Sequence, residues 1–315
     1  MYKGKKIGVV VPAYNEEILI LDTLKSMPDI IDCIFVVEDG STDCTLALIE
    51  EQQQIDGRIQ IIAHSVNQGL GKSLIDGYEA SLKSDMDYTA VMDGDNQMDP
   101  DDLPVLLDQL VDHGYDYVKG NRLLHSNIRA MPLYRFLGNA LLTILTKFAT
   151  GYYRLMDPQC AYAVIRNNVL AQLPIQNMTH GYGYNAEILT MLNIQGFSVT
   201  NVEVRPVYDR EKSKINLWTY IPRVTILLIR LFFQRLWWRY MVRDFNPLVL
   251  LYMFGFSNII FILIPFTIRF FVLWRLQQKA PEVTLLIILF TLLITFQSLI
   301  FAVWMDMDYN KDRKN

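Results

Sequence analysis

Residues 88–110, YTAVMDGDNQMDPDDLPVLLDQL, join a short apolar run to a leucine-rich segment through an acidic turn. The apolar run is typical of a buried strand, and the spacing of the leucines is typical of a helix. Asp93 and Asp95, which a single glycine separates, follow directly after the apolar run. The stretch therefore predicts one strand-loop-helix unit with two carboxylates where its strand ends.

Three similar units precede this one, at residues 6–17, 33–52 and 59–82. In the first, the strand is expected to end at Pro12 and the helix to begin near Glu16. In the second, Ser41 or Thr42 is expected to cap the helix. Successive apolar runs with intervening helices predict an α/β fold with a mainly parallel sheet, whose ligands bind at the carboxyl ends of the strands.

The chain has 315 residues, of which 51% are hydrophobic, and the apolar residues become dense beyond Trp218. Residues 247–268 and 283–305 are uncharged runs of about the twenty residues that a helix needs to span a bilayer. Two transmembrane helices are therefore expected, with a kink at Pro265 and a tight hairpin between them. Two crossings would return the C-terminus to the side of the N-terminal domain.

Residues 217–242 are also apolar, but arginines interrupt them and make a third span costly. Arg235, Arg239 and Arg243 recur every four residues, which predicts that they line one helical face. We expect amphipathic helices in the membrane interface, with a third span or a soluble helix packed on the domain as alternatives. The predicted organisation is a cytosolic domain at 1–215, interfacial helices at 216–244, a transmembrane hairpin at 245–306 and a cytosolic tail at 307–315.

Charge and cysteine content exclude several functions. The net charge of −4 and the absence of a Lys/Arg block outside the membrane region give no case for nucleic acid binding. The three cysteines have no paired or metal-like spacing, and the first residues do not resemble a signal peptide, so a cytosolic domain is expected. The histidines also lack metal spacing and are expected to be structural or exposed; they are His64, His113, His125 and His180.

Asp93 and Asp95 can both turn toward one point beyond their strand, and paired carboxylates suit Mg²⁺ or Mn²⁺. Taken alone, a solvated acidic turn is the commoner explanation of such a pair. Gly69 and Gly71 permit close approach of a ligand to the backbone, and Lys72 could meet a phosphate. The spacing of these glycines matches neither a Walker loop nor a dinucleotide fingerprint.

Four motifs occur in a fixed order: PAYNEE at 12–17, VVEDGSTDCT at 36–45, NQGLGKS at 67–73 and DGDNQ at 93–97. Together they resemble the Rossmann-like GT-A domain of family 2 glycosyltransferases over about residues 5–215. Within that family the chain looks most like the polyprenyl-phosphate glycosyltransferases, such as dolichyl-phosphate mannose synthases. The resemblance implies a UDP- or GDP-sugar donor, a polyprenyl phosphate acceptor and a Mg²⁺ or Mn²⁺ cofactor.

The resemblance also implies roles on the donor side. Asp39 would accept hydrogen bonds from the base or ribose, and Glu38 stands where the family has an aspartate. A metal and the diphosphate would be held by Asp93, Asp95 and Gln97. Arg210 and Lys214 would close over the diphosphate, although the family's glycine is missing there. The nucleotide pocket would be lined by Pro12, Tyr14 and Glu16, with the glycine loop of Gly69, Gly71 and Lys72 beside it.

On the acceptor side, a lipid phosphate is already anionic and needs cationic positioning in place of a base. Arg122 falls where the family has its G-S-R motif, and Arg135 falls on the helix that resembles the lipid-phosphate site. Asp157 is expected to orient the sugar or an arginine, with a buried structural aspartate as the alternative. Glu187 is expected to bind a sugar hydroxyl or to act as a base, and completes the predicted catalytic set of Asp95, Arg122, Arg135 and Glu187.

The predicted function is inverting transfer of a single sugar to polyprenyl phosphate at the cytosolic face of a membrane. A processive polysaccharide synthase is one alternative, but residues 234–238 only imitate its Q-x-x-R-W motif. A catalytically inactive membrane scaffold is the other. The sequence leaves open the sugar, the nucleotide, the lipid length and whether the protein forms a homo-oligomer.

Overall fold

The protein is described by a computed structural model in which residues 1–122, 133–181, 183–205 and 217–311 are placed. Two compact units divide the chain, one holding Met1–Phe233 and the other Gln234–Asp312. Arg210 and Lys214 lie outside the described residues, and the side chain of Arg135 is also outside them.

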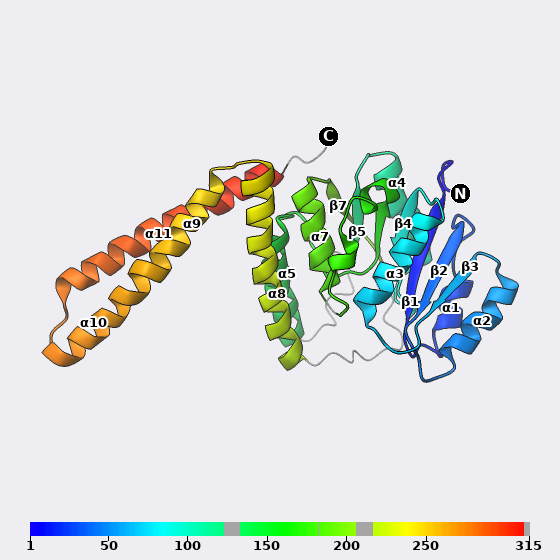
Figure 1. Cartoon of the computed structure of the whole chain (residues 1–315), viewed down its shortest axis with the longest axis horizontal. Helices are drawn as coiled ribbons and strands as arrows, with labels where there is room; N and C mark the ends of the chain where they lie inside the picture. Colours follow the sequence, from blue (N-terminus) through cyan, green and yellow to red (C-terminus); the bar gives the residue numbers. More distant parts are fainter. Residues whose placement is uncertain (123–132, 182, 206–216, 312–315) are drawn as a thin grey trace. The chain divides into compact units, whose positions relative to one another are not determined.

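A seven-stranded sheet forms the centre of the first unit, in the order β3-β2-β1-β4-β6-β5-β7 (Figure 1). Strand β6 runs antiparallel to β4 and β5, and every other pairing is parallel. The mainly parallel α/β sheet predicted from the sequence is confirmed. The strands are β1 (Ile7–Ala13), β2 (Cys33–Glu38), β3 (Ile59–Ala63), β4 (Tyr88–Val91), β5 (Tyr117–Asn121), β6 (Ala163–Arg166) and β7 (Val199–Glu203).

Helices cover both faces of this sheet, which is why the strands are continuous apolar runs. Successive residues of a strand point to opposite faces, so Val9 and Val11 pack on one side while Val10 packs on the other. The first face is covered by α1 (Ile20–Lys25), α2 (Thr45–Ile55) and α4 (Leu103–Val111). The second is covered by α3 (Leu70–Lys83), α6 (Asn167–Leu170) and α7 (Tyr184–Gln195). Short 3₁₀ turns occupy Pro100–Asp102 and Ile175–Asn177.

The first two helices begin later than predicted. Helix α1 begins at Ile20, not near Glu16, and α2 begins at Thr45 with Cys44 before it. The predicted cap by Ser41 or Thr42 is wrong, because Asp43 accepts the hydrogen bond from the backbone N–H of Thr45 at 3.0 Å. The hydroxyl of Ser41 instead accepts from the backbone of the loop after β1.

Two further helices complete the first unit, α5 (Leu133–Thr150) and α8 (Leu217–Trp237), the latter continuing into the second unit. One face of α8 packs on the domain, where Val224, Leu228 and Leu231 contact Ala149 and Ala186. Other large apolar side chains of α8 are exposed, namely Ile226, Ile229 and Phe233. The segment is thus packed on the domain and also leaves apolar surface uncovered.

The second unit holds the two predicted membrane helices. They occupy Leu248–Leu276 and Glu282–Asn310, and within the described residues these are the helices long and apolar enough to cross a bilayer. The first consists of α9 (Leu248–Asn258), a π-helical turn (Ile259–Leu263) and α10 (Ile264–Gln277), and the second is α11. Pro265 is the second residue of α10, in the first turn after the π-helical segment, where a missing backbone N–H costs little.

These two helices pack together through small and polar side chains, whereas a helix pair in a soluble protein packs through its large apolar side chains. The buried face of α11 carries small or polar residues, among them Thr284, Thr291, Thr295, Ser298 and Ala302. Ser298 donates to the carbonyl of Leu251 at 3.0 Å, and a Cβ on Gly255 would lie 2.5 Å from Leu299. Large apolar side chains such as Phe261, Phe290 and Phe296 face outward. Small residues inside and large apolar residues outside are typical of helices packed in lipid.

The prediction that Arg235, Arg239 and Arg243 line one helical face is wrong for Arg235. Arg235 is fully buried and makes a two-point ion pair with Asp306 of α11, at 2.8 and 2.7 Å. The hydroxyl of Tyr240 donates to the same carboxylate at 2.5 Å, and Asn310 donates to it at 2.8 Å. A π-helical segment, Trp238–Arg243, interrupts the regular spacing after Arg235. Four-residue periodicity therefore does not hold across this segment.

We expect Arg235→Met to destabilise the second unit by about 3–5 kcal/mol, because the carboxylate of Asp306 would stay buried without its cation. The double variant Arg235→Met, Asp306→Leu should recover most of that loss, since no charge is then left unpaired. Thermal unfolding of the detergent-purified protein measures both, with the exposed Arg243→Met as control. A double variant as unstable as the single would contradict this account.

Candidate active site

The loops after β1 and β2 are joined to each other by hydrogen bonds. Asn15 adopts a left-handed backbone (φ 55°), which asparagine tolerates better than most residues. Its side-chain oxygen accepts from the N–H of Thr42 at 2.9 Å, and its own N–H donates to Ser41 at 3.0 Å. Glu17 accepts from the N–H of Cys44 at 3.1 Å. The two motifs therefore form one structural element.

Glu38, which replaces the expected aspartate, is buried at the end of β2. Its carboxylate accepts from the backbone N–H groups of Ser41 at 2.5 Å and Gly40 at 3.3 Å. Gly40 has φ 70°, and a Cβ there would lie 2.6 Å from the backbone of Val66. The longer side chain of Glu38 thus closes its own turn and fixes the residue that follows it.

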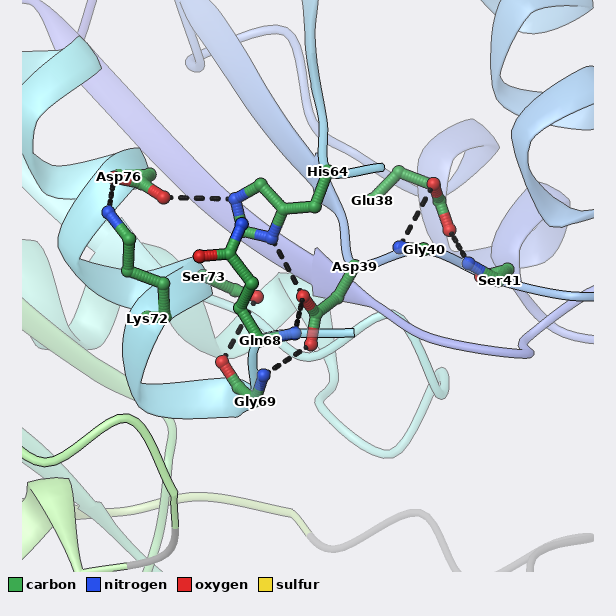
Figure 2. A network of polar contacts seen from close by, with 10 residues as sticks. All are labelled: Glu38, Asp39, Gly40, Ser41, His64, Gln68, Gly69, Lys72, Ser73 and Asp76. Atoms are coloured by element: carbon green, nitrogen blue, oxygen red, sulfur yellow. Dashed lines mark hydrogen bonds and ion pairs between the residues drawn. The ribbon is translucent and has the colours of Figure 1, made fainter. Parts of the chain in front are cut away.

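That following residue, Asp39, lies at the centre of a buried network (Figure 2). One carboxylate oxygen of Asp39 accepts from the N–H of Gln68 at 2.8 Å and lies 2.7 Å from Nδ1 of His64. The other oxygen accepts from the N–H of Gly69 at 2.8 Å. We refer to these residues, together with Lys72 and Asp76, as the Asp39 network.

Of the two alternatives expected for His64, structural or exposed, the structure has the first, because its side chain is buried and joins two carboxylates of the Asp39 network. Its Nε2 lies 2.9 Å from Asp76, which also pairs with Lys72 at 2.5 Å. The sequence carried a signal for this role, because His64 is the first residue after β3 and so lies at the ligand-binding edge of the sheet. Contact of Lys72 with a phosphate stays a prediction.

Gly69 and Gly71 were expected to let a ligand approach the backbone closely. In the structure another segment of the protein, at Thr179 and His180, makes this close approach. The carbonyl of His180 accepts from the N–H of Gly71 at 2.7 Å, and a Cβ on Gly71 would lie 2.0 Å from the carbonyl oxygen of Thr179. Glu187 holds the same segment, because its Oε2 accepts from the N–H and the hydroxyl of Thr179 at 2.8 and 2.9 Å. Glu187 is therefore tied to the start of α3 through this contact.

The acidic turn after β4 lies against the end of β1. The N–H of Gly94 donates to the carbonyl of Pro12 at 3.1 Å, and a Cβ on Gly94 would lie equally close to that oxygen. The carboxylate of Asp95 accepts from the N–H of Gln97 at 3.1 Å. The pKa values of two buried tyrosines are raised by burial and then by the charge of Asp93, namely Tyr78 of α3 and Tyr184 of α7.

The turn fits a divalent cation through its donor chemistry. Asp93 and Asp95 are both partly buried, and so is Gln97, two residues further along the chain. No three His, Cys, Asp or Glu side chains gather as a metal-holding group in the described part of the chain. Mg²⁺ commonly needs only one or two carboxylates, with water and substrate phosphates as its other ligands. The residues present therefore suit a metal that arrives with a diphosphate.

Arg122 follows β5 and is held by Asp157. Its Nε donates to Asp157 at 2.8 Å, and the carboxylate of Asp157 is buried. The side chain of Arg122 remains 34% exposed. The contact with an arginine predicted for Asp157 is therefore present, and so is the burial expected of a structural aspartate; a contact with the sugar stays a prediction. For the predicted partner Arg135, the structure gives only its backbone, in α5.

Lys119 is a buried cation that the sequence analysis missed. It lies in the middle of β5 with no exposed surface, and its Nζ donates to the side-chain oxygen of Asn185 at 2.6 Å. Burial lowers its pKa from 10.5 to about 8. Its strand reads YVKGN, a mixed sequence in which nothing marks the lysine as buried, so pattern analysis gave no signal for it.

Comparison with known proteins identifies this arrangement. The family model described as glycosyl transferase family 2 matches residues 8–173, which is more than half of the chain. The chain belongs to glycosyl transferase family 2. The match includes the Asp39 network and the acidic turn, so these features lie in the domain that defines the family.

Two curated relatives of the family are similar over most of their length. The UDP-N-acetylglucosamine–dolichyl-phosphate N-acetylglucosaminyltransferase of Methanococcus voltae is 26% identical over 65% of this chain and 86% of the relative. The polyprenol monophosphomannose synthase of Mycolicibacterium smegmatis is 28% identical over 62% of this chain and 75% of the relative.

Among solved structures, glucosyl-3-phosphoglycerate synthase from Mycobacterium tuberculosis, in complex with Mn²⁺, UDP-glucose and phosphoglyceric acid, has a TM-score of 0.54. Its sequence is 20% identical, and the match covers 74% of this chain and 80% of that one. At this identity the likeness shows the fold, which is the GT-A fold expected from the sequence.

We expect Lys119→Met to stabilise the protein by at most about 3 kcal/mol at pH 7, because it removes a buried charge whose pKa is depressed. The folded protein binds its proton less tightly than the unfolded chain, so the cost is present below pH 8 and declines as pH rises toward 10.5. Unfolding of both proteins across this range tests the sign. A difference in stability that grows with pH would contradict the assignment.

Proposed function

We propose that the protein is a membrane-bound, inverting glycosyltransferase that transfers one sugar from a nucleotide sugar to a polyprenyl phosphate. The observation that carries this proposal is the presence, in one chain, of a family 2 domain and a helical hairpin with large apolar side chains on its outer faces. The Methanococcus and Mycolicibacterium relatives, whose names specify dolichyl phosphate and polyprenol, support this acceptor class.

On the donor side, Asp39 binds the base, and the surrounding pocket is formed by Pro12, Tyr14 and Glu16. Tyr14 is 41% exposed, as suits a side chain that stacks on a ligand. Mg²⁺ or Mn²⁺, held by Asp93, Asp95 and Gln97, would supply Lewis-acid stabilisation of the leaving diphosphate. Arg210 and Lys214 close over the same diphosphate in this proposal.

On the acceptor side, Arg122 and Arg135 hold the lipid phosphate, whose oxygen attacks the anomeric carbon from the face opposite the diphosphate. A phosphate oxygen is already deprotonated near neutral pH, so no base is needed. Asp157 positions Arg122 through its 2.8 Å contact. The contact of Glu187 with Thr179 favours a positioning role for Glu187 over that of a base.

The membrane arrangement follows from the acceptor, because a polyprenyl chain stays in the bilayer. Residues 216–244 lie in the interface, where the exposed apolar side chains of α8 contact lipid, namely Ile226, Ile229 and Phe233. The hairpin of residues 245–306 anchors the enzyme. The domain of residues 1–215 and the tail of residues 307–315 both lie on the cytosolic side, where nucleotide sugars are made.

The test is transfer by the full-length protein in detergent, with a short polyprenyl phosphate, Mn²⁺ and labelled nucleotide sugars. A single monoglycosyl lipid should form, disappear with EDTA and return with Mn²⁺ or Mg²⁺. Asp95→Asn should lower the rate by about 100-fold or more, as for loss of a group that stabilises developing charge. Arg135→Ala should abolish lipid transfer while leaving nucleotide binding intact.

Other products would point elsewhere. A polysaccharide would favour a processive synthase, and nucleotide binding without any product would favour a scaffold. Transfer that is unaffected by EDTA would contradict the metal's role but not the transfer itself.

The role of Asp157 has its own test. We expect Asp157→Asn to raise the KM for polyprenyl phosphate by about tenfold, because Arg122 loses a charge-assisted partner. The KM for the donor should change much less. Arg122→Lys should behave similarly, since lysine keeps the charge but loses the planar contact. An effect confined to the donor KM would instead assign Asp157 to the sugar.

A further inference from the structure

The carboxylate of Asp39 has little hydrogen-bonding capacity left for a ligand. Each of its two oxygens carries two lone pairs, giving four acceptor positions. On Oδ1, one position is taken by the N–H of Gln68 at 2.8 Å and the other faces Nδ1 of His64 at 2.7 Å. On Oδ2, the N–H of Gly69 takes one position at 2.8 Å. Counted over the described residues, one acceptor position therefore remains, on Oδ2.

The contact with His64 holds in two of the three ring states. As an imidazolium the ring donates to Asp39 through Nδ1 and to Asp76 through Nε2, which lies 2.9 Å from that carboxylate. As the neutral Nδ1–H tautomer it still donates to Asp39, but the lone pair of Nε2 then faces the carboxylate of Asp76, so only the imidazolium satisfies both contacts. The neutral Nε2–H tautomer would place a lone pair against an oxygen of Asp39, which is unfavourable. Oδ1 of Asp39 is thus filled by protein donors.

The position of Asp39 is fixed before any ligand binds. It follows directly after β2, at the edge of the sheet where parallel α/β proteins bind nucleotides. Two backbone N–H groups and a buried ring hold its carboxylate, and only 5% of its side chain is exposed (Figure 2). A carboxylate held in this way cannot turn to offer both oxygens to a new partner.

We propose that the Asp39 network selects a uracil nucleotide, so that the donor is a UDP-sugar and not a GDP-sugar. This inference rests on the proposed function, in which Asp39 binds the base. The pairing edge of uracil presents one N–H, at N3, which needs one acceptor. The edge of guanine presents two adjacent N–H groups, at N1 and N2, which need two.

Guanine in this pocket would leave one donor without an acceptor. A buried donor left unsatisfied weakens binding by about tenfold or more, whereas uracil matches the single position that remains. His64 is then a specificity residue that acts through Asp39, because it fills the position on Oδ1 that guanine would need.

The experiment is calorimetric titration of the full-length protein in detergent, with Mn²⁺, using UDP, GDP and N3-methyl-UDP. We expect UDP to bind at least about tenfold more tightly than GDP, and N3-methylation to cost a similar factor, because it removes the one N–H that Asp39 accepts. GDP binding as tightly as UDP would overturn the proposal. Equal binding of UDP and its N3-methyl form would also overturn it, since Asp39 would then not contact the base.

Variants of His64 separate selection from simple loss of folding. His64→Ala should weaken UDP binding and bring the UDP-to-GDP affinity ratio toward one, because Oδ1 regains a free position. His113→Ala, at an exposed histidine, should leave the ratio unchanged. The ratio comes from the fraction of protein that binds nucleotide, so partial unfolding does not alter it. An unchanged ratio in His64→Ala would refute the role of His64.

Failure of this inference is distinguishable from failure of the proposed function. Lipid glycosylation from a GDP-sugar but from no UDP-sugar would overturn the inference and keep the function. Selective binding of UDP without any lipid product would keep the inference and overturn the proposed acceptor.

Discussion

The carboxylate of Asp39 is the point at which three separate parts of the chain are held together. It follows directly after β2, it contacts His64 just after β3, and it accepts from the N–H groups of Gln68 and Gly69 that lead into α3. A buried carboxylate is costly unless its oxygens are satisfied, so these contacts must form together. From α3 the constraint continues to the segment at Thr179 and His180, and through it to Glu187 on α7. The ligand-binding edge of the sheet is therefore fixed by polar contacts laid over an apolar core.

The two units differ in how the charge of a buried cation is compensated. Arg235 has a carboxylate, a phenol and a nearby amide, and its charge is fully compensated by Asp306. Lys119 has a neutral amide as its hydrogen-bond partner, and burial lowers its pKa. The first arrangement is a structural contact that holds α11 in place. The second costs stability, and a cost of this kind is more easily explained by function than by folding, because an apolar residue would fit the strand better.

The fold could be predicted because strands and membrane helices have characteristic local patterns of apolar residues. The runs ending at Ala13, Glu38 and Val91 were recognisable as strands, and the two uncharged runs as membrane helices. The predictions that failed concerned residues whose contact partners lie elsewhere in the sequence. The cap of α2 was misplaced because Ser41 is used by Asn15, and Gly71 faces Thr179, more than a hundred residues later. The buried ion pair of Arg235 was missed because its partner is on another helix and a π-helical segment breaks the periodicity.

An acceptor that is already ionised changes what the acidic residues of such a domain need to do. A hydroxyl acceptor requires a carboxylate that is free to take a proton, and that carboxylate cannot be spent on holding the backbone. Glu187 has an oxygen committed to Thr179, and Asp157 has its carboxylate committed to Arg122. Both acids are thus in contact with other groups of the protein, and part of the Arg122 side chain stays exposed. That distribution suits a phosphate acceptor, for which a fixed cation contributes more than a base.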